Sequence, residues 1–275
     1  MGERWARIVN GAARAAGDAA ADLLDAVTDR RCAGCRGPAE RRRPVCDACD
    51  AAIGRLGSAL CLPCLHGVEG ADPEAGVARR GGACPRHGSD RLVLAGPAYE
   101  PPLDAIVRAF KYEGNAHLAG WIASLVPTPP LVDGAFGREA LLVPIPLHPA
   151  RRASRGYDQA HLLAAALGRW WGVPVAPLLE RRVETRPQAR LDAEARRTNL
   201  DGAFRLVTGA DALARGRPLW IVDDVVTTGA TLLAAAQALE EARPAWILAL
   251  AASHGGHPEG AQSTSHAKVA APGGV

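Results

Sequence analysis

Short apolar runs without polar interruption predict the strands of this chain. The clearest run covers residues 219–222, a pattern typical of a strand that is buried on both faces of a sheet. Apolar runs at 141–146, 173–179 and 246–251 predict three more strands.

Segments with helical character lie between and around these runs. Residues 104–112 have helical periodicity and precede Gly114, a residue type common just after a helix end. We expect a second helix at about 118–125, a third in the Ala/Leu-rich segment through Trp171, and a fourth from Leu232 onward. Strands that alternate with helices predict an α/β fold, a twisted parallel sheet flanked by helices.

The pattern divides the chain into four parts. Residues 1–30 predict an N-terminal packing helix, and residues 31–91 hold every cysteine within Gly- and Pro-rich spacers. The α/β domain is expected at 92–254. Residues 255–275 are rich in Gly, Ser, Ala and Pro, a composition typical of a disordered tail.

Composition adds little to this division. The 275 residues carry a net charge of only +3, too small to indicate nucleic-acid binding by itself. The basic residues are almost all arginine, with Lys111 and Lys268 as the two lysines. We find no signal peptide and no uncharged apolar run near the roughly 20 residues that span a bilayer, so we expect a soluble, cytoplasmic protein without membrane insertion.

The cysteine spacing predicts metal binding. All seven cysteines lie between Cys32 and Cys84, and an odd number without a secretion signal argues against a disulfide framework. They form C-x-x-C knuckles, which place two sulfurs on one side of a tight turn and suit tetrahedral zinc. The expected ligands are Cys32, Cys35, Cys46, Cys49, Cys61, Cys64, Cys84 and His87.

Eight ligands are enough for two zinc sites in a zinc-ribbon module. The alternative, a set of redox-active pairs or incidental thiols, explains the regular spacing less well. The sequence leaves open which knuckle pairs with which, and His66 could replace His87. So short a segment has too little core to fold by apolar burial alone, so we expect metal binding to contribute to its folding.

A phosphorylated-sugar site is predicted directly after the 219–222 strand. Two adjacent carboxylates are followed by a Thr/Gly turn and then a helix, whose N-terminal amides can bind a phosphate. An acidic helix cap beside a plain turn would be the simpler interpretation. In this order, however, the segment resembles the phosphoribosyl-pyrophosphate (PRPP) motif of type I phosphoribosyltransferases. Its residues are Asp223, Asp224, Thr227, Thr228, Gly229, Ala230 and Thr231.

Three polar loops are expected to meet at the carboxyl edge of the sheet, where α/β proteins bind ligands. They cover residues 147–159, 181–199 and 223–231. From Arg151 to Leu200 there are ten arginines against five acidic residues. Arginine suits phosphate because its planar fork bonds two oxygens at once, although a solvated face is the simpler interpretation for any single arginine. For Arg151 and Arg152, just past a strand end, we favour a pyrophosphate role.

The order of these motifs resembles the ComF (competence protein F) family of phosphoribosyltransferase-like proteins over nearly the whole chain. Two features differ from the usual pattern: the fourth knuckle ends in His87 rather than Cys, and Tyr157 and Asp158 replace Phe and Asn. The shared motifs, besides the knuckles and the PRPP motif, are Phe110-Lys111-Tyr112-Glu113-Gly114, Val143-Pro144-Ile145-Pro146 with Arg151, Arg155-Gly156-Tyr157-Asp158-Gln159, Thr185-Arg186-Pro187-Gln188 with Arg196 and Asn199, and Gly202-Ala203-Phe204.

The resemblance implies a role for each motif. Asp223 and Asp224 would bind the ribose hydroxyls of PRPP, and residues 227–231 its 5′-phosphate. Pyrophosphate would be held by Arg151, Arg152 and Arg155. The segment 185–199 would close over the site with Gln188, Arg190 and Arg196 as contacts, and Mg²⁺ would accompany PRPP.

Two functions are compatible with this resemblance. The first is a PRPP-dependent transferase linked to DNA uptake and natural transformation, whose acceptor the residues do not reveal. The second is a non-catalytic accessory that binds PRPP or single-stranded DNA beside a helicase-like competence protein. A purely structural zinc adapter would not explain an intact Asp-Asp and Thr-Thr-Gly segment.

Overall fold

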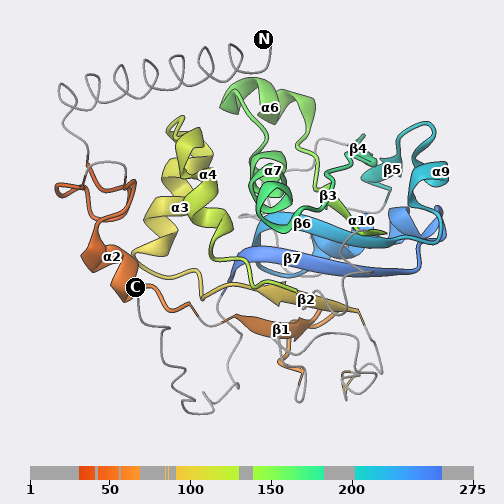
Figure 1. Cartoon of the computed structure of the whole chain (residues 1–275), viewed down its shortest axis with the longest axis horizontal. Coiled ribbons are helices and arrows are strands. Elements are labelled where there is room, and N and C mark those ends of the chain that lie inside the picture. Colours follow the sequence, from red (N-terminus) through yellow and green to blue (C-terminus); the bar gives the residue numbers. More distant parts are fainter. Residues whose placement is uncertain are drawn as a thin grey trace, which may run out of the picture.

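The computed structural model describes residues 31–40, 43–55, 57–68, 84, 86, 91–129, 139–182 and 202–255 (Figure 1). Several predicted features lie outside the described residues. They are the helix at 1–30, the ligand His87, the contacts Gln188, Arg190 and Arg196, and the tail beyond Gly255.

A five-stranded sheet forms the centre of the fold. Its strands lie in the order β1 (Ser58–Cys61), β2 (Leu92–Ala95), β7 (Trp246–His254), β6 (Pro218–Val226) and β3 (Leu141–Pro144). β1 runs antiparallel to β2, whereas β2, β7, β6 and β3 are parallel neighbours. The mostly parallel α/β sheet predicted from the sequence is confirmed.

Helices cover both faces of this sheet. On one face, α3 (Leu103–Tyr112), α4 (Ala119–Ala123) and α7 (Gln159–Trp171) pack against Trp220 and Val222 of β6. On the other face, α10 (Ala230–Glu240) packs against Leu219 and Ile221. The remaining elements are α2 (Asp47–Ala52), the 3₁₀ turn η1 (Ala116–Leu118), α6 (Pro149–Arg155), β4 (Leu179–Arg181), β5 (Phe204–Leu206) and α9 (Ala210–Ala214).

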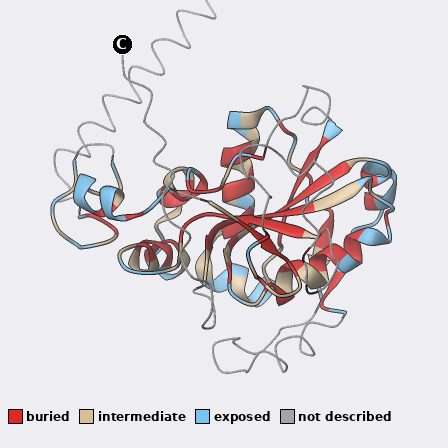
Figure 2. Ribbon diagram, turned by 90° about the horizontal axis from the view of Figure 1, so that it is seen from below, coloured by how far each residue is buried: buried red, intermediate tan, exposed pale blue. Residues whose placement is uncertain are grey.

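Burial on both faces explains the uninterrupted apolar run of β6. Successive strand residues point to opposite faces, so a strand covered on both sides requires apolar side chains throughout. Leu219, Trp220, Ile221 and Val222 are each at most 1% exposed. Figure 2 shows the buried core running through the strands, with exposed residues concentrated on the outer helices and loops.

Three expected elements differ in the structure. The run at 173–179 is not a regular strand: Val175 forms an isolated parallel bridge with Leu142, because Pro174 and Pro177 lack the amide hydrogens that a ladder needs. The expected loop at 147–159 contains α6, whose first residue is Pro149. The strand at 219–222 continues through both aspartates to Val226, because β7 extends to His254 and pairs with it.

The cysteine-rich segment contributes directly to the central sheet. β1 ends at Cys61 and pairs with β2, with Ser58 opposite Ala95 and Cys61 opposite Leu92. The domain boundary predicted between residues 91 and 92 therefore falls between two strands that are neighbours in one sheet.

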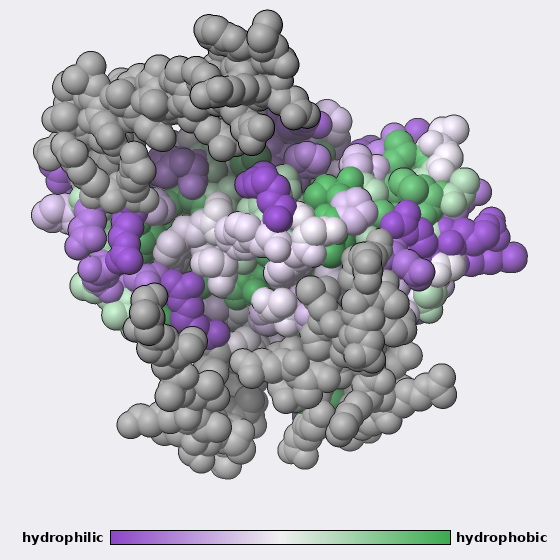
Figure 3. Space-filling view, viewed as in Figure 1, coloured by the Kyte–Doolittle hydropathy of each residue, from purple (hydrophilic) through white to green (hydrophobic). Residues whose placement is uncertain are grey.

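The outer surface mixes polar and apolar residues. Figure 3 shows polar side chains next to smaller apolar areas on the described part of one face. Large hydrophobic residues that are exposed in the described chain are Tyr112, Trp170, Val207 and Leu213. No helix among the described residues is long and apolar enough to cross a membrane.

Candidate functional site

A cavity of about 480 Å³ lies beside the carboxyl ends of β3 and β6. Its walls come from six segments: the end of α3, the loop and helix α6 after β3, the start of α7, the end of β4, the end of β6, and the turn that leads into α10. The three regions that the sequence predicted to meet, at 147–159, 181–199 and 223–231, each contribute described residues to this cavity. The topology of the parallel sheet brings them together.

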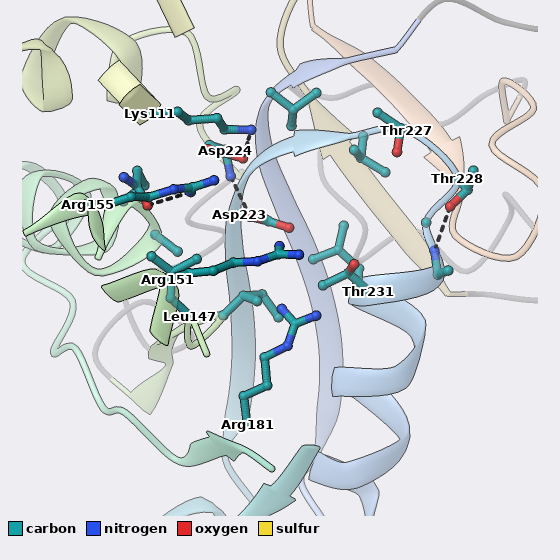
Figure 4. Close-up of a pocket in the computed structure, with 18 of the residues that line it drawn as sticks. Lys111, Leu147, Arg151, Arg155, Arg181, Asp223, Asp224, Thr227, Thr228 and Thr231 are labelled. Atoms are coloured by element: carbon teal, nitrogen blue, oxygen red, sulfur yellow. Dashed lines mark hydrogen bonds and ion pairs between the residues drawn. The ribbon is translucent and has the colours of Figure 1, made fainter. Parts of the chain in front are cut away.

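The two aspartates lie in the centre of the cavity wall but face different partners. Because they are adjacent in β6, their side chains point to opposite faces of the strand. Asp224 is 6% exposed, and its Oδ1 lies 3.0 Å from Nζ of Lys111 at the end of α3 (Figure 4). Burial alone would lower the pKa of Lys111, but the charges of Asp224 and Asp223 outweigh it, so the pKa is raised.

Asp223 is the more unusual carboxyl group. Desolvation and the neighbouring charge of Asp224 raise its pKa to about 7, although Lys111 and Arg181 act in the opposite direction. Its Oδ1 accepts a hydrogen bond of 2.9 Å from the backbone N–H of Asp224. A carboxyl group that titrates near neutrality is common at functional sites, where ligand binding can change its protonation.

The Thr/Gly turn forms the opposite side of the cavity. Thr227, Thr228 and Thr231 all line it, and Gly229 adopts a left-handed conformation with φ of 71° directly before α10. The Val226 carbonyl accepts a hydrogen bond of 2.7 Å from the Gly255 N–H, which ties the turn to the end of β7. The Ala230 N–H donates to Thr228 Oγ1 at 3.5 Å, and the first turn of α10, at the positive end of the helix dipole, borders the cavity.

Arginine side chains form the third side. Arg151 of α6, Arg155 at its end and Arg181 of β4 all line the cavity, whereas Arg152 is exposed and does not. Gln159 is buried, and its Oε1 accepts a hydrogen bond of 3.1 Å from Arg155, which helps to orient the guanidinium. Burial and the charge of Arg151 lower the pKa of Arg181, so an anion near these two arginines would relieve their repulsion.

The balance of charge in the cavity favours an anionic ligand. Four cationic side chains line it against two carboxylates, and Asp223 is only partly ionised near pH 7. The cations are Lys111, Arg151, Arg155 and Arg181, and the carboxylates are Asp223 and Asp224.

The structure brings together most, but not all, of the predicted residues. Every described residue of the 223–231 prediction lines the cavity, with Arg151 and Arg155. Lys111 and Arg181 were not predicted as site residues. The sequence does contain a feature that could have identified Lys111 as a site residue: it is one of two lysines in an arginine-rich chain and lies in a shared family motif. Arg181 is the first residue of the 181–199 loop that was expected at this edge, although it was not singled out as a contact.

The first cysteine cluster joins the first two knuckles. Cys32, Cys35, Cys46 and Cys49 place their sulfur atoms within 4.8 Å of one another. Backbone N–H groups of Gly34 and Cys46 donate to Cys32 Sγ at 3.4 and 3.3 Å. Burial acts to raise the pKa of the Cys32 thiol, but the backbone amides of Cys46, Cys35 and Gly34 outweigh it and lower the pKa to about 6. Four converging sulfurs with a stabilised thiolate fit a tetrahedral metal.

The second cluster joins the third knuckle to Cys84. Cys61, Cys64 and Cys84 again lie within 4.8 Å of one another, with Cys64 Sγ and Cys84 Sγ 3.7 Å apart. His66 is not part of this group; its Nδ1 lies 3.3 Å from the Cys64 carbonyl oxygen. Three sulfurs therefore could hold a second metal, and the structure groups the first knuckle with the second and the third knuckle with Cys84.

Comparison with known proteins gives three informative relatives. No family model matches the chain. It is 34% identical over 149 residues to competence protein F of Haemophilus influenzae, covering 52% of this chain and 63% of the relative. It is 33% identical over 196 residues to the DNA utilization protein YhgH of Salmonella typhimurium, covering 68% of this chain and 80% of the relative. It is 36% identical over 93 residues to competence protein ComFC of Bacillus subtilis, covering 34% of this chain and 35% of the relative.

The fold and its cysteine clusters define a class: a mixed α/β protein with a mostly parallel sheet and a zinc-ribbon-like module. Similarity to these relatives is extensive enough to name the family within that class. The chain belongs to the ComF family of competence and DNA utilization proteins. It spans 63% of the length of the Haemophilus relative and 59% of the Escherichia coli relatives.

Proposed function

We propose that the cavity binds PRPP and that the chain is a phosphoribosyltransferase-like protein with a type I phosphoribosyltransferase fold. One observation carries this proposal. A helix-capping Thr/Gly turn, an aspartate pair and a group of cations share one cavity at the carboxyl edge of a parallel sheet. A phosphorylated pentose that carries a second phosphate group needs binding groups of these three kinds.

The 5′-phosphate would bind at residues 227–231. The helix N-terminus offers backbone N–H donors and a positive dipole end, and the threonine hydroxyls add donors. Gly229 allows the backbone to take the left-handed conformation that starts α10. In Figure 4, Thr227, Thr228 and Thr231 lie on one side of the aspartates and Arg155 on the other.

The ribose and pyrophosphate would occupy the rest of the cavity. Asp223 and Asp224 would accept hydrogen bonds from ribose hydroxyls, which are neutral donors. Arg151, Arg155 and Arg181 would hold pyrophosphate through charge-assisted bonds, with the predicted contacts Gln188, Arg190 and Arg196 completing the site. Mg²⁺ would bind together with PRPP, with Asp223 and Asp224 as the nearby carboxylates, and would offset the negative charge of the phosphate groups.

The reaction would be displacement of pyrophosphate from the ribose C1 by an acceptor nucleophile. The new bond forms at C1 as the C1–O bond breaks, and the bonding electron pair leaves with pyrophosphate. Catalysis of this kind depends on positioning and on stabilising charge in the transition state. The arginines would stabilise the departing pyrophosphate, and the carboxylates would favour positive charge on the ribose ring.

A second function is supported by the names of the relatives. They are called competence and DNA utilization proteins, so we propose that this chain acts in DNA uptake or in the use of DNA. The alternative to catalysis is an accessory in the cytoplasm that binds PRPP or single-stranded DNA beside a helicase-like competence protein. The two cysteine clusters would hold Zn²⁺ as a structural metal in either case.

The first experiment is a calorimetric titration of PRPP with Mg²⁺, followed by measurement of pyrophosphate release with candidate nucleobases. Asp223→Asn should weaken PRPP binding, because an amide accepts hydrogen bonds less strongly than a carboxylate. Asp211→Asn, on exposed α9, is the matched control. Release on adding an acceptor would establish a transferase. Binding without release would favour the accessory function, and absence of binding would refute both forms of the PRPP proposal.

A further inference from the structure

The backbone of the cysteine-rich segment touches the Thr/Gly turn. A Cβ atom added to Gly229 would lie 2.5 Å from the carbonyl oxygen of Leu62, and 3.4 and 3.5 Å from side-chain atoms of Leu65 and Leu62. Leu62 lies between Cys61 and Cys64, and Leu65 directly follows Cys64. The turn therefore rests on the third knuckle, with no room for a side chain between them.

The knuckle is itself held in a tight conformation. The Leu65 N–H donates to the Cys61 carbonyl at 2.6 Å, and the Cys61 N–H donates to the His66 carbonyl at 2.8 Å. Leu65 adopts a left-handed φ of 55°, which is unfavourable for a side chain of this size. A metal that joins Cys61 and Cys64 to Cys84 would hold this conformation closed.

Apolar packing connects the same two segments. Leu62 and Leu65 are buried in the hydrophobic cluster that also contains Val226 and Ala230, the residues on either side of the turn. Figure 4 shows the turn with Thr227 and Thr228 beside the orange ribbon of the cysteine-rich segment. Movement of the knuckle would therefore be transmitted to the turn.

The first cluster contacts a different part of the protein. The Cβ position of Gly34 lies 3.2 Å from Pro102 at the start of α3, and Arg36 forms an ion pair of 2.5 Å with Glu113 after its end. Trp121 of α4 donates to Asp50 Oδ1 at 2.9 Å. This cluster braces the helical layer, so it provides an internal control for effects of metal loss.

We infer that the second cysteine cluster is a positioning element for the phosphate-binding turn, so that metal bound there sets the affinity of the cavity for a phosphate monoester. The inference rests on the proposed function, because it takes residues 227–231 as the phosphate site. With the metal present, the Leu62 carbonyl and the Leu65 side chain hold Gly229 and the first amides of α10 in place. Without it, the knuckle opens and the turn loses its support.

The test compares two cysteine variants, Cys64→Ser in the second cluster and Cys35→Ser in the first. Metal content, melting temperature, hydrogen exchange of residues 223–232 and affinity for ribose 5-phosphate are measured for each. Cys64→Ser should speed exchange of the turn and weaken ribose 5-phosphate binding about tenfold, as expected if the correctly placed fraction falls to about one tenth. Cys35→Ser should lose metal but bind within about twofold of the unaltered protein. Equal exchange and equal affinity in the two variants would overturn the inference.

A second pair of variants leaves all the thiols intact. Leu65→Ala removes a side chain that lies 3.4 Å from the Cβ position of Gly229, whereas Val45→Ala removes one beside the first cluster. Both variants should keep their metal, but only Leu65→Ala should loosen the turn and weaken ribose 5-phosphate binding. If Cys64→Ser does not fold, this pair decides the test, and identical behaviour of the two variants would refute the coupling. If the unaltered protein does not bind ribose 5-phosphate, the proposed function fails, and hydrogen exchange of the turn still decides the coupling.

Discussion

The Lys111–Asp224 ion pair should be a measurable source of stability. Its atoms lie 3.0 Å apart, with side chains that are 21% and 9% exposed. Asp224→Asn keeps the shape of the side chain but removes the charge that balances Lys111. The variant should therefore leave an uncompensated cation beside the core, and no cavity in the packing.

The magnitude follows from burial and from the remaining neighbours. Removing one partner of a buried ion pair costs about 3–5 kcal/mol, but Lys111 borders an open cavity and keeps the charge of Asp223, so we expect about 2 kcal/mol. For a chain of this size that corresponds to a fall in melting temperature of about 4–8 °C. Thermal unfolding followed by circular dichroism, with zinc held constant, measures it.

A double-mutant cycle separates the ion pair from other effects. Lys111→Met should lower the free energy of unfolding less in the Asp224→Asn background than in the unaltered protein, because the cation that it removes has already lost its partner. Asp211→Asn is the control, since Asp211 and Arg215 form an exposed pair at 4.0 Å and should contribute less than about 0.5 kcal/mol. If Asp224→Asn has the same melting temperature as Asp211→Asn, the buried pair does not stabilise the fold.

Two further predictions concern the cavity. Arg151→Ala should weaken PRPP binding about tenfold, which is the effect of losing one charge-assisted hydrogen bond. The control is Arg152→Ala, an exposed neighbour outside the cavity, which should change PRPP affinity less than about twofold. Equal losses of affinity in calorimetry would contradict the placement of Arg151. The pKa of Asp223 is raised to about 7 from 3.8, so its ionisation opposes folding: relative to Asp223→Asn, the stability of the unaltered protein should be highest near pH 4 and fall as the pH rises through 7. Comparing the two proteins at each pH cancels effects on the cysteines, and a difference in unfolding free energy that stays constant from pH 5 to 8 would refute the assignment.

Local patterns predicted many of the elements. The helix expected at 104–112 is α3 (Leu103–Tyr112), followed by Gly114 with φ of 73°. The strand expected at 219–222 lies within β6, since a strand covered on both faces must be apolar throughout. The strand expected at 173–179 was wrong, because prolines interrupt a run that hydrophobicity alone favours.

The residues of the 223–231 segment were predictable because they are contiguous and because a strand, turn and helix in sequence form a local arrangement that can bind a phosphate. Lys111 was not, since it comes from α3 and reaches the cavity only when α3 packs beside β6; for Arg181, the sequence placed its loop at the site but did not single out the residue. The raised pKa of Asp223 has the same origin: desolvation and charge proximity depend on neighbours that the chain brings from elsewhere.

The cysteines show most clearly what the sequence determines and what depends on tertiary structure. The sequence by itself determined that there are C-x-x-C knuckles of a kind that can bind a metal, because two sulfurs three residues apart share one turn. Only the tertiary structure decided that the first two knuckles form one cluster and the third joins Cys84, because these pairings depend on how distant turns approach one another. Contact between Leu62 and Gly229 was decided in the same way, when β1 joined the edge of the sheet and brought a cysteine knuckle against the turn after β6.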